Sequence, residues 1–168
     1  RDEQDMFALN SQEKTQDAIS KDKFKNELIK LKINTDVKNF IFEKDEHPRS
    51  NLNLEDLKKL KTVFKENGTV TAGNSSGIND GAAATILMPR EEAELRKIEP
   101  LAKVMSWASC GVEPSLMGLG PIPAVNMALK KAGWKIEDID LFEINEAFAA
   151  QSIAVIRDLK IPKEIVNV

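Results

Sequence analysis

The sequence is poor in the residues that most often build catalytic and metal sites. Its 168 residues include one cysteine, Cys110, one histidine, His47, and no tyrosine. One cysteine excludes a disulfide within the chain, and one cysteine with one histidine argues against a zinc site of the usual type. A Ser/His/Asp catalytic set is not credible when the only histidine lies in a loop. Cys110 has no basic partner that can be named, so we expect it to be a structural residue.

Strong net charge and long apolar runs are also absent. The formal net charge is −3, which predicts no general attraction to nucleic acid. No apolar run approaches the ~20 residues that a membrane-spanning helix needs. Residues 1–14 are too polar for a signal peptide. Because the composition is also ordinary for a globular protein, we expect a soluble, cytoplasmic protein with no nucleic-acid or membrane partner.

Both ends of the sequence interrupt a pattern. Helical spacing is already present at Arg1, which is not a methionine, and residues 165–168 are strand-like without a closing element. We therefore expect the chain to be an internal segment of a longer protein.

Apolar spacing and turn-forming residues predict several elements in the first hundred residues. We expect helices over 1–20, over 53–65 and from Pro89, a strand over 38–42 and a loop over 45–50. Gly68 follows the second helix as a natural left-handed cap. Residues 82–88 fit a buried strand or a buried helix, because periodicity does not separate the two.

From residue 101 the pattern changes to alternating strands and helices. We expect strands over 101–109, over 139–144 and from Val166, and helices from Pro121 to a cap at Gly133 and over 147–159. This alternation is typical of a mostly parallel, layered α/β unit.

The junction between the strand ending at Ile144 and the next helix is the first candidate site. Asn145 lies at this junction, and ligands of α/β sheets gather beyond the carboxyl ends of strands. The same position suits a helix N-cap, and the residues alone favour this simpler interpretation. Glu146 is likewise more simply explained as a partner of the helix dipole.

The segment 68–84, rich in Gly, Ala, Ser and Asn, is the second candidate. The hydroxyls of Ser75 and Ser76 and exposed backbone N–H groups could hold an amide or a phosphate. The glycine spacing fits neither a Walker loop nor a dinucleotide fingerprint, and a tight irregular connection explains the segment equally well. A third candidate is the loop 117–121, which could line an apolar slot but is more simply a strand-to-helix turn.

Three strings in the sequence resemble motifs of the thiolase family. Asn145–Ala149 reads NEAFA, Gly68–Ala84 resembles the family's serine-containing coenzyme A segment, and Gly118–Ala124 resembles its GxGPxPA turn. The similarity runs from Arg1 to Val168 in the same order and spacing. Within the family it is strongest to the acetyl-CoA acetyltransferases.

The resemblance implies a portion of the layered α/β/α fold of thiolases. Residues 1–78 would be the remainder of the coenzyme A-binding loop domain, 79–100 the last segment of the first core half, and 101–168 the start of the second core half. It further implies a full-length homotetramer that acts in fatty acid metabolism.

The chemistry implied by the resemblance is the condensation of two acetyl-CoA molecules to acetoacetyl-CoA, or the reverse thiolysis, with coenzyme A thioesters as substrates and no further cofactor. In the family, one cysteine carries the acetyl group as a thioester and a second removes a proton from the attacking acetyl-CoA. The asparagine of NEAFA holds a water that helps to stabilise the thioester oxygen. By the motif, that residue is Asn145, the one catalytic residue that we expect in this chain.

The resemblance also assigns binding residues. The serine that contacts the pantetheine amide maps to Ser76, and its small neighbours that let the pantetheine arm lie close are Ala72, Gly73 and Ser75. Arg49 is expected to face the nucleotide end of coenzyme A. The residues expected to line the channel and the acyl pocket are Phe64, Met117, Ala147 and Phe148.

Several functional residues of the family have no counterpart in this sequence. The nucleophilic cysteine belongs to a motif before the region that Arg1 matches, and the catalytic histidine and second cysteine belong to motifs after the region that Val168 matches. Cys110 fits neither cysteine motif, so we expect the isolated chain to be inactive. Some members have an aromatic residue in the loop of His47 that helps to frame a potassium site; without a tyrosine we assign no metal ligand.

Two other functions are considered. A non-catalytic coenzyme A-binding or assembly module would explain the missing cysteines and histidine. A decarboxylating condensing enzyme of the same fold usually carries two histidines and lacks NEAFA, so it fits the sequence less well.

Overall fold

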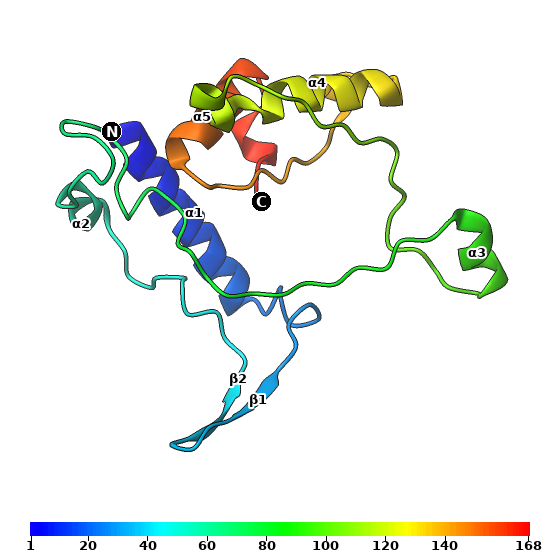
Figure 1. Cartoon of the computed structure of the whole chain (residues 1–168), viewed down its shortest axis with the longest axis horizontal. Helices are drawn as coiled ribbons and strands as arrows, with labels where there is room; N and C mark the ends of the chain where they lie inside the picture. Colours follow the sequence, from blue (N-terminus) through cyan, green and yellow to red (C-terminus); the bar gives the residue numbers. More distant parts are fainter.

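The computed structural model describes residues 1–168 as a mainly helical chain with one small sheet (Figure 1). The helices are α1 (Asp2–Ser20), α2 (Leu54–Lys58), α3 (Arg90–Leu95), α4 (Pro121–Ala132) and α5 (Ala149–Asp158), with 3-10 helices η1 (Pro114–Leu119), η2 (Ile136–Asp138) and η3 (Lys163–Ile165). Strands β1 (Leu31–Asn34) and β2 (Asn39–Phe42) pair antiparallel, with Leu31 opposite Phe42. No helix has both the length and the apolar composition needed to cross a membrane.

Most of the predicted helices are confirmed. α1, α3 and α4 lie where the sequence pattern placed them, α5 begins two residues later than predicted, and β2 covers all but the first residue of the predicted strand. α4 begins at Pro121. Proline suits this position because the first N–H groups of a helix have no partner within it, so the N–H that proline lacks is not needed. It ends at Gly133, whose φ of 73° lies in the left-handed region, so the predicted glycine cap is confirmed.

The second predicted helix is too long, because α2 ends at Lys58 and not at Lys65. The carbonyl oxygen of Leu57 accepts a hydrogen bond of 2.6 Å from Arg1 Nη2, so a side chain satisfies a group at the end of the helix. Residues 62–71 then form a turn that is closed by an antiparallel bridge between its first and last residues.

The left-handed residue of this turn is Asn67, and the predicted role of Gly68 is wrong. Asn67 has a φ of 56°, which asparagine tolerates better than most residues. Gly68 is needed because of a close approach: a Cβ atom there would lie 2.9 Å from the carbonyl oxygen of Lys65. The glycine therefore makes room for backbone and does not cap a helix.

The strand predicted over 101–109 and the element predicted over 82–88 do not form. Figure 1 shows both stretches as long connections on either side of α3, and no backbone hydrogen bond joins residues 77–88 or 99–112 to another segment. A strand needs a neighbour for its N–H and C=O groups, and these stretches have none in the chain. The predicted layered sheet is therefore absent from residues 1–168, although its helices are present.

One pairing of the predicted parallel kind does form. Phe142 and Val166 make an isolated parallel bridge. The N–H of Phe142 donates to the carbonyl of Ile165, and the carbonyl of Phe142 accepts from the N–H of Asn167, both at 2.8 Å. The strands predicted over 139–144 and from Val166 thus meet in the expected direction, but over one residue pair only.

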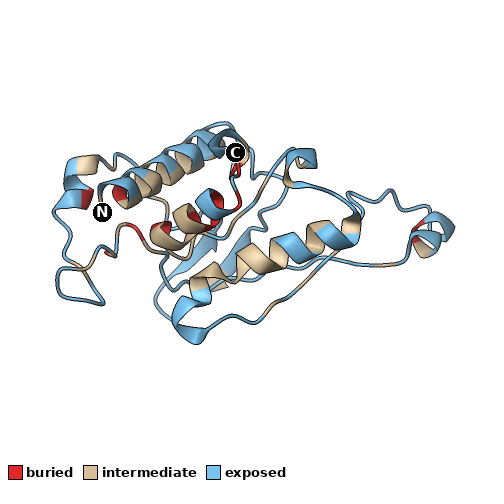
Figure 2. Ribbon diagram, turned by 90° about the horizontal axis from the view of Figure 1, so that it is seen from above, coloured by how far each residue is buried: buried red, intermediate tan, exposed pale blue.

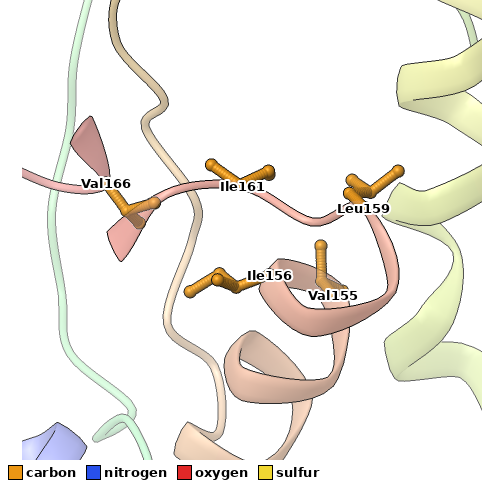
Figure 3. Close-up of a cluster of buried hydrophobic side chains, with 5 residues drawn as sticks. All are labelled: Val155, Ile156, Leu159, Ile161 and Val166. Carbon is orange, nitrogen blue, oxygen red and sulfur yellow. The ribbon is translucent and has the colours of Figure 1, made fainter. Parts of the chain in front are cut away.

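The buried core lies where α5 is followed by the returning C-terminal segment (Figure 3). It consists of the apolar side chains of Val155, Ile156, Leu159, Ile161 and Val166. Only 12 of the 168 residues are buried, and Figure 2 shows them mostly along α5, the C-terminal segment and the start of α1. The well-packed region of the molecule is therefore the one around α1 and α5.

Candidate active site

The turn before α5 is held by hydrogen bonds to a segment far away in the sequence. Ser76 N–H donates to the carbonyl of Ala147, and Ala149 N–H donates to the carbonyl of Asn74, both at 2.9 Å. These two stretches run antiparallel, so the peptide groups before Ala149 are not free to join the helix. The N-cap of α5 is accordingly Phe148, and it makes no side-chain cap bond.

Asn145 is therefore not the N-cap, and the simpler interpretation of this residue is wrong. It precedes the cap residue Phe148 and its side chain is exposed. Glu146 does not lie in the first turn of the helix either. Its Oε1 atom accepts a hydrogen bond of 2.7 Å from Asn167 Nδ2. The turn thus presents an amide to solvent while the neighbouring carboxylate is tied inward.

The segment around Ser75 is fixed by a buried polar network. Asn74 Nδ2 donates to Asp5 Oδ1 at 2.8 Å, and Asn74 Oδ1 accepts from the N–H of Thr71 at 2.8 Å. Asp5 is fully buried and forms an ion pair of 2.7 Å with Arg1. The hydroxyl of Ser75 donates to the carbonyl of Thr71 at 2.7 Å. Because these polar groups satisfy one another, the network holds the segment in one conformation.

A pocket of about 220 Å³ opens beside this segment. Three of the predicted binding residues line it, namely Gly73, Ser75 and Ser76, together with His47 and polar side chains of α1. His47 lies close to the serine segment, because a Cβ atom on Gly77 would lie 2.8 Å from its Cε1 atom. Most of the lining residues are polar, and their hydroxyl and amide groups suit a ligand that carries amide groups.

Phe64 and Phe148, two of the predicted channel residues, are in contact. Their ring centroids lie 6.0 Å apart at an interplanar angle of 76°, an edge-to-face arrangement. Since Phe148 also pairs with Ser75 through an antiparallel bridge, an aromatic wall adjoins the serine segment. Ala147 lies between this wall and Asn145 and is half-buried.

The remaining predicted residues lie at the edge of this arrangement. The Arg49 N–H donates to Gln12 Oε1 of α1 at 2.9 Å, which fixes the loop while the residue stays exposed. Ala72 is exposed beside Gly73. Met117, on η1, is also exposed and does not line the pocket. The structure thus brings the serine segment, the phenylalanines and the NEAFA turn together, although Phe64, Phe148 and Asn145, like Met117, do not line the pocket.

Sequence reasoning missed three residues that support the site. Glu146 lines the pocket, although its position in the sequence predicts only a dipole partner. Asp5 reads as an ordinary partner of Arg1 one helical turn away, and nothing in the local pattern marks it as buried. Asn167 follows an apolar run without any motif that we could use. Only contacts between distant segments reveal the roles of these residues.

The site offers mainly neutral donors and acceptors. No three His, Cys, Asp or Glu side chains lie close enough together to hold a metal ion. Cys110 is half-buried, free and outside the pocket. Shifted pKa values belong to surface ion pairs: a hydrogen bond from Lys30 lowers the pKa of Glu43 on the β1–β2 hairpin, and a hydrogen bond to Glu55 raises the pKa of Lys58.

Known proteins of the thiolase family match this chain along its length. Residues 1–91 match the N-terminal domain of thiolases, and residues 98–168 match the C-terminal domain. The acetyl-CoA acetyltransferase of Syntrophomonas wolfei is 55% identical over 159 residues, which cover 95% of this chain and 40% of the relative. That of Shinella zoogloeoides is 49% identical over 168 residues, which cover 100% of this chain and 43% of the relative.

Solved structures agree with these sequence matches. The crystal structure of the Bacillus anthracis acetyl-CoA acetyltransferase superposes with a TM-score of 0.97 at 44% identity, over 99% of this chain and 42% of that one. Human mitochondrial 3-ketoacyl-CoA thiolase gives a TM-score of 0.89 at 39% identity, over 99% of this chain and 42% of that one. This chain spans about two fifths of the length of the proteins it matches, and over that span it belongs to the thiolase family.

Proposed function

We propose that the natural protein containing residues 1–168, called the full-length protein below, is an acetyl-CoA C-acetyltransferase. It condenses two acetyl-CoA molecules to acetoacetyl-CoA or carries out the reverse thiolysis. The observation that carries this proposal is the hydrogen bond from Ser76 N–H to the carbonyl of Ala147, at 2.9 Å. It joins the proposed coenzyme A segment to the turn that carries the proposed catalytic Asn145.

In this proposal the serine segment holds the pantetheine arm of coenzyme A. The hydroxyl of Ser76 bonds a pantetheine amide, because the Ser75 hydroxyl is already used within the segment. Ala72 and Gly73 are small, so the pantetheine arm can lie close to their backbone. Arg49, exposed on its anchored loop, meets the nucleotide end, where a guanidinium can stack on adenine or bind phosphate.

The acyl end of the substrate then lies near the NEAFA turn. Phe64, Ala147 and Phe148 form the apolar wall of the channel, and Met117 is assigned to the same wall. The exposed amide of Asn145 holds a water that donates to the thioester oxygen as negative charge develops there. A neutral amide suits this role, since it orients the water without adding a charge that competes with the developing one.

The covalent chemistry is assigned to segments of the full-length protein outside this chain. Cys110 is half-buried and matches neither cysteine motif of the family, so the two reactive cysteines and the histidine are placed in segments that the longer relatives have and residues 1–168 do not. We retain the division into a loop-domain segment (residues 1–78), a first-core segment (residues 79–100) and a second-core segment (residues 101–168). We also retain the cytoplasmic homotetramer as a prediction.

Steady-state kinetics of the full-length Asn145→Ala variant tests the assignment. We expect kcat to fall by roughly a hundredfold, because one donor to the developing oxyanion is lost. The KM for acetyl-CoA should change little, since the coenzyme A contacts remain. The matched control is Asn126→Ala. Asn126 is also an exposed asparagine but lies on α4, away from the turn of Asn145, and its loss should leave both kcat and KM unchanged. A rise in KM with unchanged kcat would refute the role of Asn145.

A non-catalytic coenzyme A-binding module is the second candidate, favoured by the single cysteine lying outside the pocket. Calorimetry of coenzyme A against residues 1–168 separates the two proposals. We expect weak or no binding by the chain alone, because its sheet is incomplete. Sub-millimolar affinity that is lost in Ser76→Ala would instead favour the module.

A further inference from the structure

Asn167 makes three side-chain hydrogen bonds to the residues on either side of Asn145. Its Oδ1 atom accepts from the N–H of Ile144 at 2.7 Å, and its Nδ2 atom donates to the carbonyl of Ile144 at 2.9 Å. Nδ2 also donates to Glu146 Oε1 at 2.7 Å. One carboxamide thus binds both backbone groups of the residue before Asn145 and the side chain of the residue after it.

These side-chain hydrogen bonds take the place of backbone hydrogen bonds that would continue the parallel pairing beyond Phe142. The carbonyl of Phe142 accepts from the N–H of Asn167 at 2.8 Å. In a regular parallel ladder the next bond would join the N–H of Ile144 to the backbone carbonyl of Asn167. Here the Asn167 side chain takes that bond and supplies the return bond as well.

The backbone conformation of Asn167 explains why its side chain, and not its main chain, bonds Ile144. Its φ of 47° lies in the left-handed region, which few residues other than glycine and asparagine adopt readily. The main chain therefore turns out of the strand direction, and the carboxamide points back along the edge that the backbone would have continued. An asparagine meets both demands, because it tolerates the turn and carries a donor and an acceptor on one planar group.

We propose that Asn167 is a positioning residue that fixes the turn of Asn145 and thereby the direction of its amide. With both backbone groups of Ile144 bonded, the two peptide planes leading into Asn145 are held. The tie to Glu146 and the bond from Ser76 N–H to the carbonyl of Ala147 hold the chain beyond it. The inference rests on the proposed function, in which the Asn145 amide orients a water at the reacting thioester.

The test uses the full-length protein and the variants Asn167→Gly, Asn145→Ala and the double variant. Glycine accepts a φ of 47° without strain, so Asn167→Gly removes the carboxamide and keeps the backbone. Asn51→Gly is the matched control, because Asn51 is exposed and has a φ of 63°. Should Asn167→Gly not fold, Asn167→Asp keeps the acceptor for the Ile144 N–H and loses both donor bonds.

We expect Asn167→Gly to lower kcat by about ten- to a hundredfold, as small misplacements of catalytic groups do. The KM for acetyl-CoA should stay the same. The double variant should be no slower than Asn145→Ala, because the two residues act through one amide. Hydrogen exchange of a peptide covering residues 141–146 should become faster in Asn167→Gly. Asn51→Gly should change neither this exchange rate nor kcat.

The outcomes separate this inference from the proposed function. If Asn145→Ala itself keeps full kcat, the proposed function of Asn145 fails. If Asn145→Ala is slow but Asn167→Gly turns over normally despite faster exchange, the positioning role is overturned. A double variant whose losses multiply also overturns it, because Asn167 would then act by a separate route.

Discussion

Asp5 is a fully buried carboxylate that connects three distant regions of the chain. One of its oxygens accepts from Arg1 Nε at 2.7 Å and the other from Asn74 Nδ2 at 2.8 Å. Arg1 in turn bonds the carbonyl of Leu57. The ion pair therefore joins the start of α1 to the end of α2 and to the serine segment of the site.

Asp5→Ala should lower the free energy of unfolding of the full-length protein by roughly 3 kcal/mol, because it takes one acceptor from the buried amide of Asn74 and one from the partly buried guanidinium of Arg1. Urea unfolding followed by tryptophan fluorescence measures the loss. Asp2→Ala is the matched control: Asp2 is exposed in the first turn of the same helix, and its loss should cost less than about 0.5 kcal/mol. Equal effects of the two substitutions would show that the network does not stabilise the protein.

Among single residues, the sequence pointed to the candidate site segments but not to the residues that support them. The serine segment and the NEAFA turn were identified from small-residue composition and a motif, and the structure brings them into contact. Asp5 and Asn167 could not be identified, since each acts on a residue far away in the sequence. Local periodicity contains no information about such pairings.

Between elements, Gly73 packs closely against Leu57 of α2 and against Leu60, which follows that helix. A Cβ atom at this position would lie 2.5 Å from Leu57 Cδ2 and 2.6 Å from Leu60 Cδ1. Leu57 is 1% exposed and therefore packed on all sides, whereas Leu60 is 38% exposed. A side chain at position 73 would therefore push the serine segment away from α2.

Gly73→Ala should destabilise the full-length protein by roughly 2 kcal/mol, the usual cost of overpacking, and should raise the KM for acetyl-CoA. The double variant Gly73→Ala/Leu57→Ala tests the cause. Removing the Leu57 side chain makes room for the new methyl group, so the double variant should lose less stability than the sum of the two single losses. Additive losses from urea unfolding would show that the methyl group does not contact Leu57.

The elements that the sequence predicted correctly are those that can form locally. α1, α4 and α5 have helical spacing and, in the case of α4, a glycine cap. α2 was predicted too long because Arg1, more than fifty residues away, satisfies the end of the helix. Strand β1 was not predicted at all. The remaining errors concern strands, whose hydrogen bonds depend on partners elsewhere in the fold.

Across the whole molecule, burial is concentrated around α1 and α5, and Ala93 on α3 is buried apart from them. Figure 2 shows the connections around α3 largely exposed, with a few half-buried positions such as Ser106 and Cys110. They carry large apolar side chains, among them Leu87 at 80% and Trp107 at 72% exposure. Lys131 contacts the Trp107 ring at 5.2 Å from its centroid, so the 101–113 stretch touches α4 on one side only. Its backbone groups have no strand partner.

Residues 1–168 produced alone should therefore self-associate, because exposed apolar side chains and unpaired strand edges favour contact between chains. Sedimentation velocity should show species larger than the monomer that grow with concentration. Val104→Lys, on the unpaired 101–113 stretch, should shift the distribution towards monomer. Val37→Lys, a lone exposed apolar residue in the tip between β1 and β2, should not. A monomer at every concentration would mean that these stretches need no partner, and the two lysine variants should then behave alike.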